Sequence, residues 1–226
     1  MKTFIIYCML SALSSMVCGQ IYQDGKEYQT ENNMYRCHVT STESFRNSFR
    51  NQGVEPTWSK GPSYYWYAFT NTQNVLEGTP TGVRGIDNPG VNSERKLLEL
   101  LCEVYGGKEK IKSMGSERIS FRFYFGMDLK VKELKITVSS EYEDIKTTVL
   151  QLETIENLVK ERIYGIFNHE SPQYRDAIYT IYSGGYMYPI SQISEILETG
   201  EYDDLIYGMR RKIDGGFISR LKEISK

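Results

Sequence analysis

The stretch RISFRFYFGMDLKVKELKITVS, residues 118–139, carries the clearest secondary-structure pattern in the chain. In its first half, the apolar residues Ile119, Phe121, Phe123 and Phe125 alternate with Ser120, Arg122 and Tyr124. Alternation of this kind is typical of a strand buried on one face. A Gly/Asp turn follows, and then Leu134, Ile136 and Val138 share one face of a second strand. Val131 is out of phase with them, which predicts a bulge or a place in the turn.

A helix is predicted on each side of this hairpin. Before it, apolar residues recur at helical spacing from Leu97 to Tyr105, with Asn92 or Ser93 as the N-cap and Gly106-Gly107 as the stop. After it, an amphipathic pattern runs from Leu152 to Ile166, with residues 148–151 near its start.

Nearer the N-terminus, residues 27–30 and 34–40 predict a hairpin around the Asn32-Asn33 turn. Residues 41–61 are polar and predicted to be irregular. The aromatic run GPSYYWYAFTNTQ, residues 61–73, contains a predicted strand over 63–70. Alternation points Tyr64, Trp66 and Ala68 to one face and Tyr65, Tyr67 and Phe69 to the other. Because both sets are largely apolar, the strand is expected to be central and mostly core, with any recognition coming from its Thr70 end.

Residues 71–90, rich in Gly and Pro, predict a long loop. Residues 177–190, AIYTIYSGGYMYPI, predict a hairpin turning at residues 183–185, and residues 191–226 a tail of short helices. The order of elements predicts one α+β domain over residues 20–226. Its sheet is mainly antiparallel, with helices packed on one face.

The first 19 residues have the order of a secretory signal, which predicts a secreted protein in the periplasm or at the cell surface. A single basic residue, Lys2, precedes an apolar run, and small residues precede Gln20. Cleavage before Gln20 is the main interpretation, and lipidation of Cys18 is the alternative. No later stretch is apolar enough to predict an integral membrane segment.

Removing residues 1–19 leaves 26 Lys+Arg and all 29 Asp+Glu, a net charge of −3. This mixed surface, without clustered basic residues, argues against a nucleic-acid partner. Cys37 and Cys102 remain after cleavage. A disulfide between them, in an oxidising compartment, and two free thiols are both open.

No catalytic, metal or cofactor motif is present. The two histidines, His38 and His169, lack metal-ligand spacing, and no C-x-x-C, serine-hydrolase elbow or phosphate loop occurs. Cys37 and His38, as strand neighbours, point to opposite faces, so they form no dyad. Pairing of either cysteine with His169 stays open. The densest acidic clusters, residues 141–144 and 201–204, are expected to be solvated turns.

Aromatic side chains are the remaining candidates for ligand binding, because Tyr and Trp combine a flat apolar face with a polar tip. They lie near the long loop, and the full set of candidates is Trp58, Tyr64, Trp66, Tyr67, Arg84 and Asp87. The alternative is that tyrosines simply fill a sheet face.

Residues 118–190, in the order strand, Gly/Asp turn, strand, helix, strand, resemble the C-terminal domain of TonB-type proteins. FYFGMDLKVKELKITV carries that resemblance. With the signal ending at Gln20 and the motif NMYRCHV, the chain also resembles small exported, uncharacterised proteins of gut Bacteroides-type bacteria. That resemblance implies a periplasmic or surface location and no established activity.

The sequence thus predicts an exported, non-enzymatic protein that binds a protein or a cell-envelope component. A carbohydrate-binding module with exposed Trp and Tyr rings is the first alternative, and a hydrolase with paired carboxylates is the second.

Overall fold

The structure, a computed structural model, describes residues 19–53, 63–73, 90–126, 128–166, 179–182, 187–204, 209–214 and 217–220. The helices within these ranges are α2 (Thr42–Arg50), α3 (Glu94–Val104), α4 (Lys108–Lys112), α5 (Val149–Arg162), the 3-10 helix η4 (Ile190–Gln192) and α6 (Ile193–Thr199). The strands are β1 (Glu27–Gln29), β2 (Met34–Ser41), β3 (Tyr65–Asn71), β4 (Gly90–Val91), β5 (Arg118–Gly126), β6 (Val131–Ser140), β7 (Gly165–Ile166), β8 (Tyr179–Tyr182), β9 (Met187–Pro189), β10 (Glu201–Asp204), β11 (Met209–Lys212) and β12 (Phe217–Arg220).

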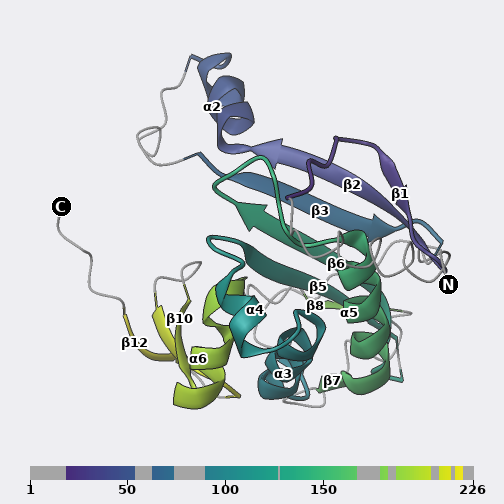
Figure 1. Cartoon of the computed structure of the whole chain (residues 1–226), viewed down its shortest axis with the longest axis vertical. Coiled ribbons are helices and arrows are strands. Elements are labelled where there is room, and N and C mark those ends of the chain that lie inside the picture. The colour runs from purple at the N-terminus through teal and green to yellow at the C-terminus, as the bar shows by residue number, and fades with distance from the viewer. Residues whose placement is uncertain are drawn as a thin grey trace, which may run out of the picture.

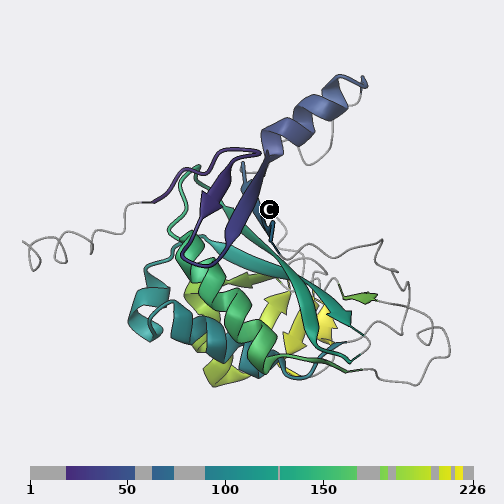
Figure 2. The ribbon, with the colours of Figure 1, turned by 90° about the vertical axis from the view of Figure 1, so that its right-hand side faces the viewer.

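The main sheet of the described residues has the strand order β1-β2-β3-β6-β5-β8, with β9 also paired to β5. Every pairing in it is antiparallel. Helices α3, α4, α5 and α6 lie on one side of this sheet, whereas α2 projects away from the body beyond the end of β2 (Figures 1 and 2). The predicted α+β class, with a mainly antiparallel sheet, is confirmed.

The β5–β6 hairpin forms the centre of the fold, as its alternation predicts. Ile119, Phe121, Phe123 and Phe125 are buried, and each is at most 4% exposed. The pairing register shifts between Tyr124 and Phe125, so that Phe125 lies opposite Val131. This irregularity is the bulge that the phase of Val131 predicts.

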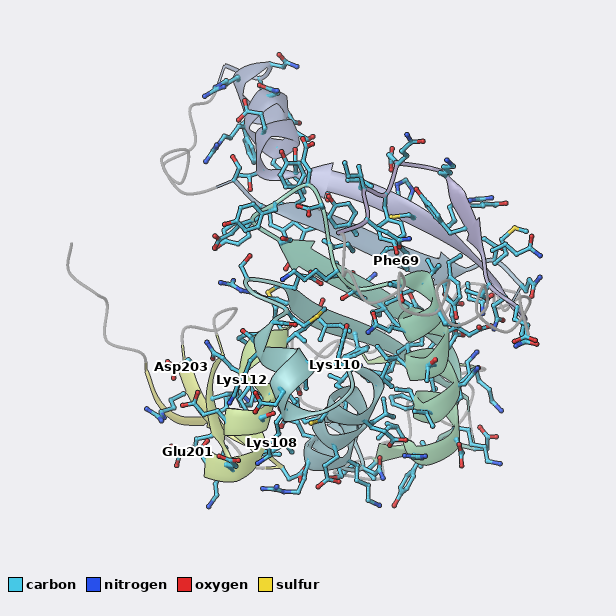
Figure 3. The ribbon with its side chains drawn as sticks, in the orientation of Figure 1. Phe69, Lys108, Lys110, Lys112, Glu201 and Asp203 are labelled. Atoms are coloured by element: carbon cyan, nitrogen blue, oxygen red, sulfur yellow. The ribbon has the colours of Figure 1, made fainter. Side chains whose placement is uncertain are left out.

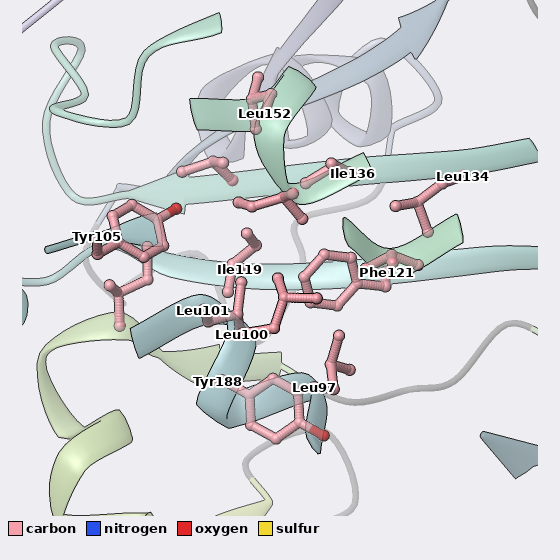
Figure 4. Close-up of a cluster of buried hydrophobic side chains, with 14 of the residues drawn as sticks. Leu97, Leu100, Leu101, Tyr105, Ile119, Phe121, Leu134, Ile136, Leu152 and Tyr188 are labelled. Atoms are coloured by element: carbon pink, nitrogen blue, oxygen red, sulfur yellow. The ribbon is translucent and has the colours of Figure 1, made fainter. Parts of the chain in front are cut away.

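The core lies between this hairpin and the two longest helices (Figure 4). Leu97, Leu100 and Leu101 of α3 and Leu152 of α5 are each at most 2% exposed. Both helices have the predicted N-termini, but α5 ends at Arg162, and Ile166, predicted at its end, lies in β7. Ser93 accepts a hydrogen bond from Lys96 N, and Thr148 and Gln151 form a reciprocal capping box. Gly106 and Gly107, with φ of 83° and 89°, end α3 in the left-handed region that glycine favours.

Residues 41–61 contain a helix that the sequence analysis missed. Ser41 caps α2, and Glu43 in its first turn pairs with Arg46 at 3.4 Å and with Arg50 at 3.3 Å. Phe45 and Phe49 are the only large apolar residues in this helix. Two residues one turn apart give too sparse a periodicity to predict a helix, and local capping and ion pairs specify it instead.

The predicted hairpin at residues 177–190 is wrong. Tyr182 of β8 lies opposite Phe123, and Met187 of β9 lies opposite Ser120, so both strands run antiparallel along β5 in succession. The Gly184-Gly185 pair predicted a reversal. Pairing with β5 is favoured over a hairpin because it places the fully buried Tyr188 in the core beside Ile119.

The prediction of a helical tail over residues 191–226 is correct only up to Thr199. Gly200, with φ of 75°, ends α6 in the left-handed region. The strands β10, β11 and β12 then form a separate antiparallel sheet. In it Tyr202 lies opposite Arg211, whose guanidinium stands 5.8 Å from the tyrosine ring centroid. These two buried side chains stabilise the small sheet, and no sequence pattern predicts that they are in contact.

Near this sheet, charged residues of α4 and β10 lie on the same side of the molecule. Figure 3 labels Lys108, Lys110 and Lys112 of α4 together with Glu201 and Asp203 of β10. The Lys108 ammonium forms an ion pair with Glu198 of α6. Arg210 of β11 pairs with Glu201 at 3.1 Å.

Candidate binding face

The face of the main sheet opposite α3 and α5, here called the outer face, carries three rows of side chains. The rows cross the strands, and the pairing register defines them. The aromatic row is Thr40, Trp66, Ser139, Arg118 and Pro189. The small row is His38, Ala68, Thr137, Ser120 and Met187. The basic row is Glu27, Arg36, Thr70, Lys135 and Arg122.

At the aromatic row, the rings of Phe45 and Tyr64 lie against Trp66. The Phe45 ring of α2 stands 5.8 Å from the Trp66 ring at an interplanar angle of 78°, and the Tyr64 ring stands 6.3 Å away at 36°. Trp66 and Tyr64 are half-buried, and Phe45 is 47% exposed. Edge-on arrangements like that of Phe45 and Trp66 are favourable for aromatic pairs, and they leave ring surface facing solvent. The cluster is therefore an apolar contact surface at one end of the outer face.

Polar groups fix the position of Tyr64 in this cluster. The Arg118 guanidinium stands 5.3 Å from the Tyr64 ring centroid, within cation–π range. The Tyr64 hydroxyl donates to Glu141 Oε1 at 3.2 Å. Tyr65, the next residue, points to the other face, where its hydroxyl donates to Glu143 Oε1 at 3.0 Å. The aromatic end of the outer face thus borders one exposed carboxylate, that of Glu141.

At the opposite end of the face, two cations meet across the β5–β6 pairing. Arg122 and Lys135 are directly opposite partners, an arrangement that is unfavourable for like charges. Lys135 is partly neutralised, because its ammonium lies 3.5 Å from Glu133 and 5.2 Å from the Tyr124 ring centroid. Arg122 is exposed, and no residue in the described part of the chain forms an ion pair with it.

Of the predicted binding residues, two lie on the outer face, one lies in the core and three lie outside the described residues. Tyr64 and Trp66 share the outer face, as alternation predicts. Tyr67 points into the core at 1% exposure, and its hydroxyl donates to the Glu143 carbonyl oxygen. Burial raises the pKa of Tyr67. Trp58, Arg84 and Asp87 lie outside the described residues, as does most of the predicted loop over 71–90.

Buried carboxylates are the other candidates for a functional role. Glu156 of α5, 1% exposed, accepts hydrogen bonds from Tyr35 Oη at 2.5 Å, Asn71 Nδ2 at 3.1 Å and Lys160 Nζ at 2.6 Å. One turn earlier, Glu153 accepts from Thr30 Oγ1 at 2.9 Å and Asn33 Nδ2 at 2.7 Å. This network lies at the Thr70 end of β3, where recognition was expected.

Two further buried carboxylates join distant elements. Glu94 accepts from the Tyr188 and Tyr202 hydroxyls at 2.7 and 2.6 Å. Glu117 accepts from Lys146 N at 2.5 Å and from Thr147 Oγ1 at 2.8 Å. Burial raises the pKa of Glu117, although these hydrogen bonds oppose the shift.

Groups of the chain itself donate to these four carboxylates, which therefore serve as structural acceptors. The acidic cluster at residues 141–144 is exposed, as expected of a solvated turn. The same expectation is wrong for residues 201–204, which form strand β10, because Tyr202 packs into the core at 5% exposure. Within the described ranges, no group of three or more His, Cys, Asp or Glu side chains could hold a metal ion. No helix among those described is long and apolar enough to span a membrane.

Cys37 and Cys102 are free thiols, one of the two states that the sequence left open. Cys37 is fully buried, whereas its neighbour His38 is exposed and lies 3.0 Å from Asp24. The two side chains therefore point to opposite faces, as predicted. Burial raises the pKa of the Cys37 thiol to about 12, which makes it a poor nucleophile.

Sequence reasoning missed Phe45, Arg118, Arg122 and Lys135 as members of the candidate face. Phe45 comes from the unpredicted helix α2. A signal for the cations existed in the alternation of RISFRFYF, because Arg118 and Arg122 share the face opposite the phenylalanines. Only the register with β6 and β3 shows that they lie in the same rows as Lys135 and Trp66.

No protein-family model and no curated protein matches this chain. Among solved structures, the chain is similar to a DUF5043 family protein from Bacteroides uniformis ATCC 8492. Sequence identity is 14%, the match covers 76% of this chain and 94% of that chain, and the TM-score is 0.48. A likeness at this level assigns neither family nor function. The resemblance of residues 118–190 to TonB C-terminal domains stays a prediction.

Proposed function

We propose that the chain is an exported protein that binds another protein or a cell-envelope component through the outer face of its main sheet. The observation that carries the proposal is the cluster of Phe45, Tyr64 and Trp66, where two separate elements present partly exposed rings at one end of that face. Aromatic side chains of this kind are the usual energetic centres of protein interfaces.

The ring geometry favours a protein partner over a sugar. A flat carbohydrate platform needs roughly coplanar exposed rings, but the rings around Trp66 are inclined at 36° and 78°. Edge-on rings instead leave an angular apolar surface that suits an inserted side chain.

Two features support export: the signal-like residues 1–19, and the hydrogen bonds by which Gln20 joins the fold. Gln20 N donates to the Ile145 carbonyl oxygen at 2.6 Å, and Ile145 N donates to the Gln20 carbonyl oxygen at 3.0 Å. Cleavage before Gln20 would leave this pair intact, which supports that position. Fractionation of expressing cells and N-terminal sequencing test the proposal. A mature chain in the exported fraction that begins at Gln20 is expected. A cytoplasmic chain that begins at Met1 would contradict export, and a chain that begins at a lipidated Cys18 would establish the alternative.

Binding is tested with the mature chain immobilised against solubilised envelope extract, followed by measurement of the affinity of any retained partner. Phe45→Ala and Trp66→Ala are each expected to weaken retention at least about tenfold, as loss of an interface anchor does. Leu150→Ala, which truncates a 61%-exposed side chain on α5, is the matched control. Circular dichroism confirms that each variant is folded. Retention that is equal in all four proteins would contradict the proposed role of this face.

A further inference from the structure

We propose that the outer face takes an extended acidic peptide, with an apolar side chain on the Trp66 cluster and a carboxylate over Arg122 and Lys135. This inference rests on the proposed function and names the chemistry of the partner segment. It follows from the distribution of charge over the three rows.

Positive charge is in excess within the three rows, which contain Arg36, Arg118, Arg122 and Lys135 against Glu27, although the whole chain carries a net −2. In the basic row, Arg36 pairs with Glu27 at 2.6 Å and Lys135 lies 3.5 Å from Glu133. Arg122 has no ion pair with any described residue, and it stands opposite the like charge of Lys135. A carboxylate from a partner would relieve this repulsion and form charge-assisted hydrogen bonds with the guanidinium.

The other end of the face has a different preference. Beside the aromatic row, Glu141 accepts a hydrogen bond from Tyr64, and the Arg118 guanidinium lies over the same ring. These opposite charges offset each other and give a partner carboxylate no net attraction, whereas an apolar side chain can contact the rings of Phe45 and Trp66. The face therefore discriminates between the two ends of a bound segment.

The distance between the aromatic and basic rows determines how far apart the apolar and acidic residues of the bound peptide must be. Thr70 of the basic row and Trp66 of the aromatic row are four residues apart on β3, as are Arg122 and Arg118 on β5. Four residues of strand span about 13 Å, and residues i and i+4 of an extended peptide point to the same side. The fitting pattern is an apolar residue followed, or preceded, by an acidic residue four positions away. The small row, with Ala68, Ser120 and Thr137 at its centre, lies beneath the intervening residues.

Two other occupants fit less well. A second copy of the chain that packs with the same rows facing each other would bring the two basic rows together, which costs binding energy. An anionic bilayer would meet Glu141 as well as the cations, because a flat surface contacts both ends of the face at once.

The test measures binding of the mature chain to synthetic polymers of defined chemistry. The random copolymer of glutamate and tyrosine is expected to bind, and the copolymer of lysine and tyrosine is not. Affinity for the acidic copolymer should fall at least tenfold in Arg122→Glu. It should also fall as NaCl rises from about 50 to about 500 mM, since exposed charges are screened. Polygalacturonate, which supplies carboxylates on a sugar chain, should bind at least tenfold more weakly.

Arg122→Glu is informative because it should not unfold the protein. It replaces a like-charge pair with an opposite-charge pair across from Lys135, so the melting temperature should be unchanged or higher. Lys96→Glu makes the same change in net charge at an exposed position of α3 and is expected to bind normally. No binding of the acidic copolymer, equal binding by Arg122→Glu, or equal affinity for polygalacturonate would each overturn the inference. If the envelope partner is lost in Trp66→Ala but retained in Arg122→Glu, the proposed function stands and only the acidic chemistry fails.

Discussion

At the residue scale, the buried hydroxyl of Tyr35 is expected to contribute to the free energy of unfolding. Tyr35 is 1% exposed, and its hydroxyl donates to Glu156 Oε2 at 2.5 Å. Tyr35→Phe keeps the ring but removes a donor from a buried carboxylate, which should lower the free energy of unfolding by about 1–3 kcal/mol. Urea denaturation measures the change. Tyr65→Phe removes a hydroxyl that bonds an exposed carboxylate, and it should cost less than about 0.5 kcal/mol. Equal effects of the two substitutions would refute a special role for the buried bond.

The two thiols should also differ sharply in reactivity. Cys37 is fully buried and the pKa of its thiol is raised to about 12, so little thiolate exists near neutral pH. Iodoacetamide at pH 8 should label native Cys37 at least about a hundredfold more slowly than the unfolded chain. Half-buried Cys102 should react first. Mass spectrometry after timed quenching locates the label. Recovery of a chain with no alkylatable thiol after unfolding would show a disulfide instead.

Among the elements, α5 has the best-defined start. Thr148 Oγ1 accepts from Gln151 N at 3.2 Å, and Gln151 Oε1 accepts from Thr148 N at 2.9 Å. Thr148→Ala removes the cap and should lower the free energy of unfolding by about 1 kcal/mol. Thr154→Ala is the matched control, because its exposed hydroxyl only bonds the Leu150 carbonyl within the helix. That control should change stability by less than about 0.5 kcal/mol, and a loss as large as that of Thr148→Ala would contradict the capping role.

Elements specified by local patterns could be predicted from sequence, and those specified by distant pairing could not. The alternation around Phe121, the phase of Val131 and the cap at Ser93 each act within a few residues, and each prediction is confirmed. The strands β8 and β9 depend on β5, more than fifty residues earlier in the chain. Their Gly-Gly signal was therefore misread as a hairpin turn.

The same distinction applies to the candidate face. Alternation separated Tyr64 and Trp66 from Tyr65, but it did not show that Tyr67 would be fully buried while Trp66 kept contact with solvent. Exposure depends on which face the helices cover, and that is a property of the assembled fold. Phe45 reaches Trp66 only because α2 projects from the end of β2. No pattern within residues 41–50 encodes that contact.

At the scale of the whole molecule, buried hydrogen bonds join segments far apart in sequence. Glu94 at the start of α3 binds Tyr188 of β9 and Tyr202 of β10. The Tyr105 hydroxyl lies 3.1 Å from Thr147 Oγ1, and Tyr22 donates to the Thr147 carbonyl oxygen at 3.1 Å. Tyrosines thus contribute both apolar area and polar links, which accounts for their abundance in this chain better than a ligand platform does.

Buried tyrosines should make the whole fold sensitive to alkali. Burial raises the pKa of Tyr22, Tyr35, Tyr67 and Tyr105, so the folded state keeps protons that the unfolded state loses near pH 10. Their contribution is complete below pH 10, and stability falls as pH rises above it. Tyrosinate absorbance should therefore rise in two phases: a reversible one from exposed rings, and a later one that coincides with loss of circular dichroism. Tyr105→Phe should shrink the later phase and leave the first unchanged. In concentrated guanidinium chloride all tyrosines should ionise together, and a single phase near pH 10 in the native protein would show that these hydroxyls are not held in the core.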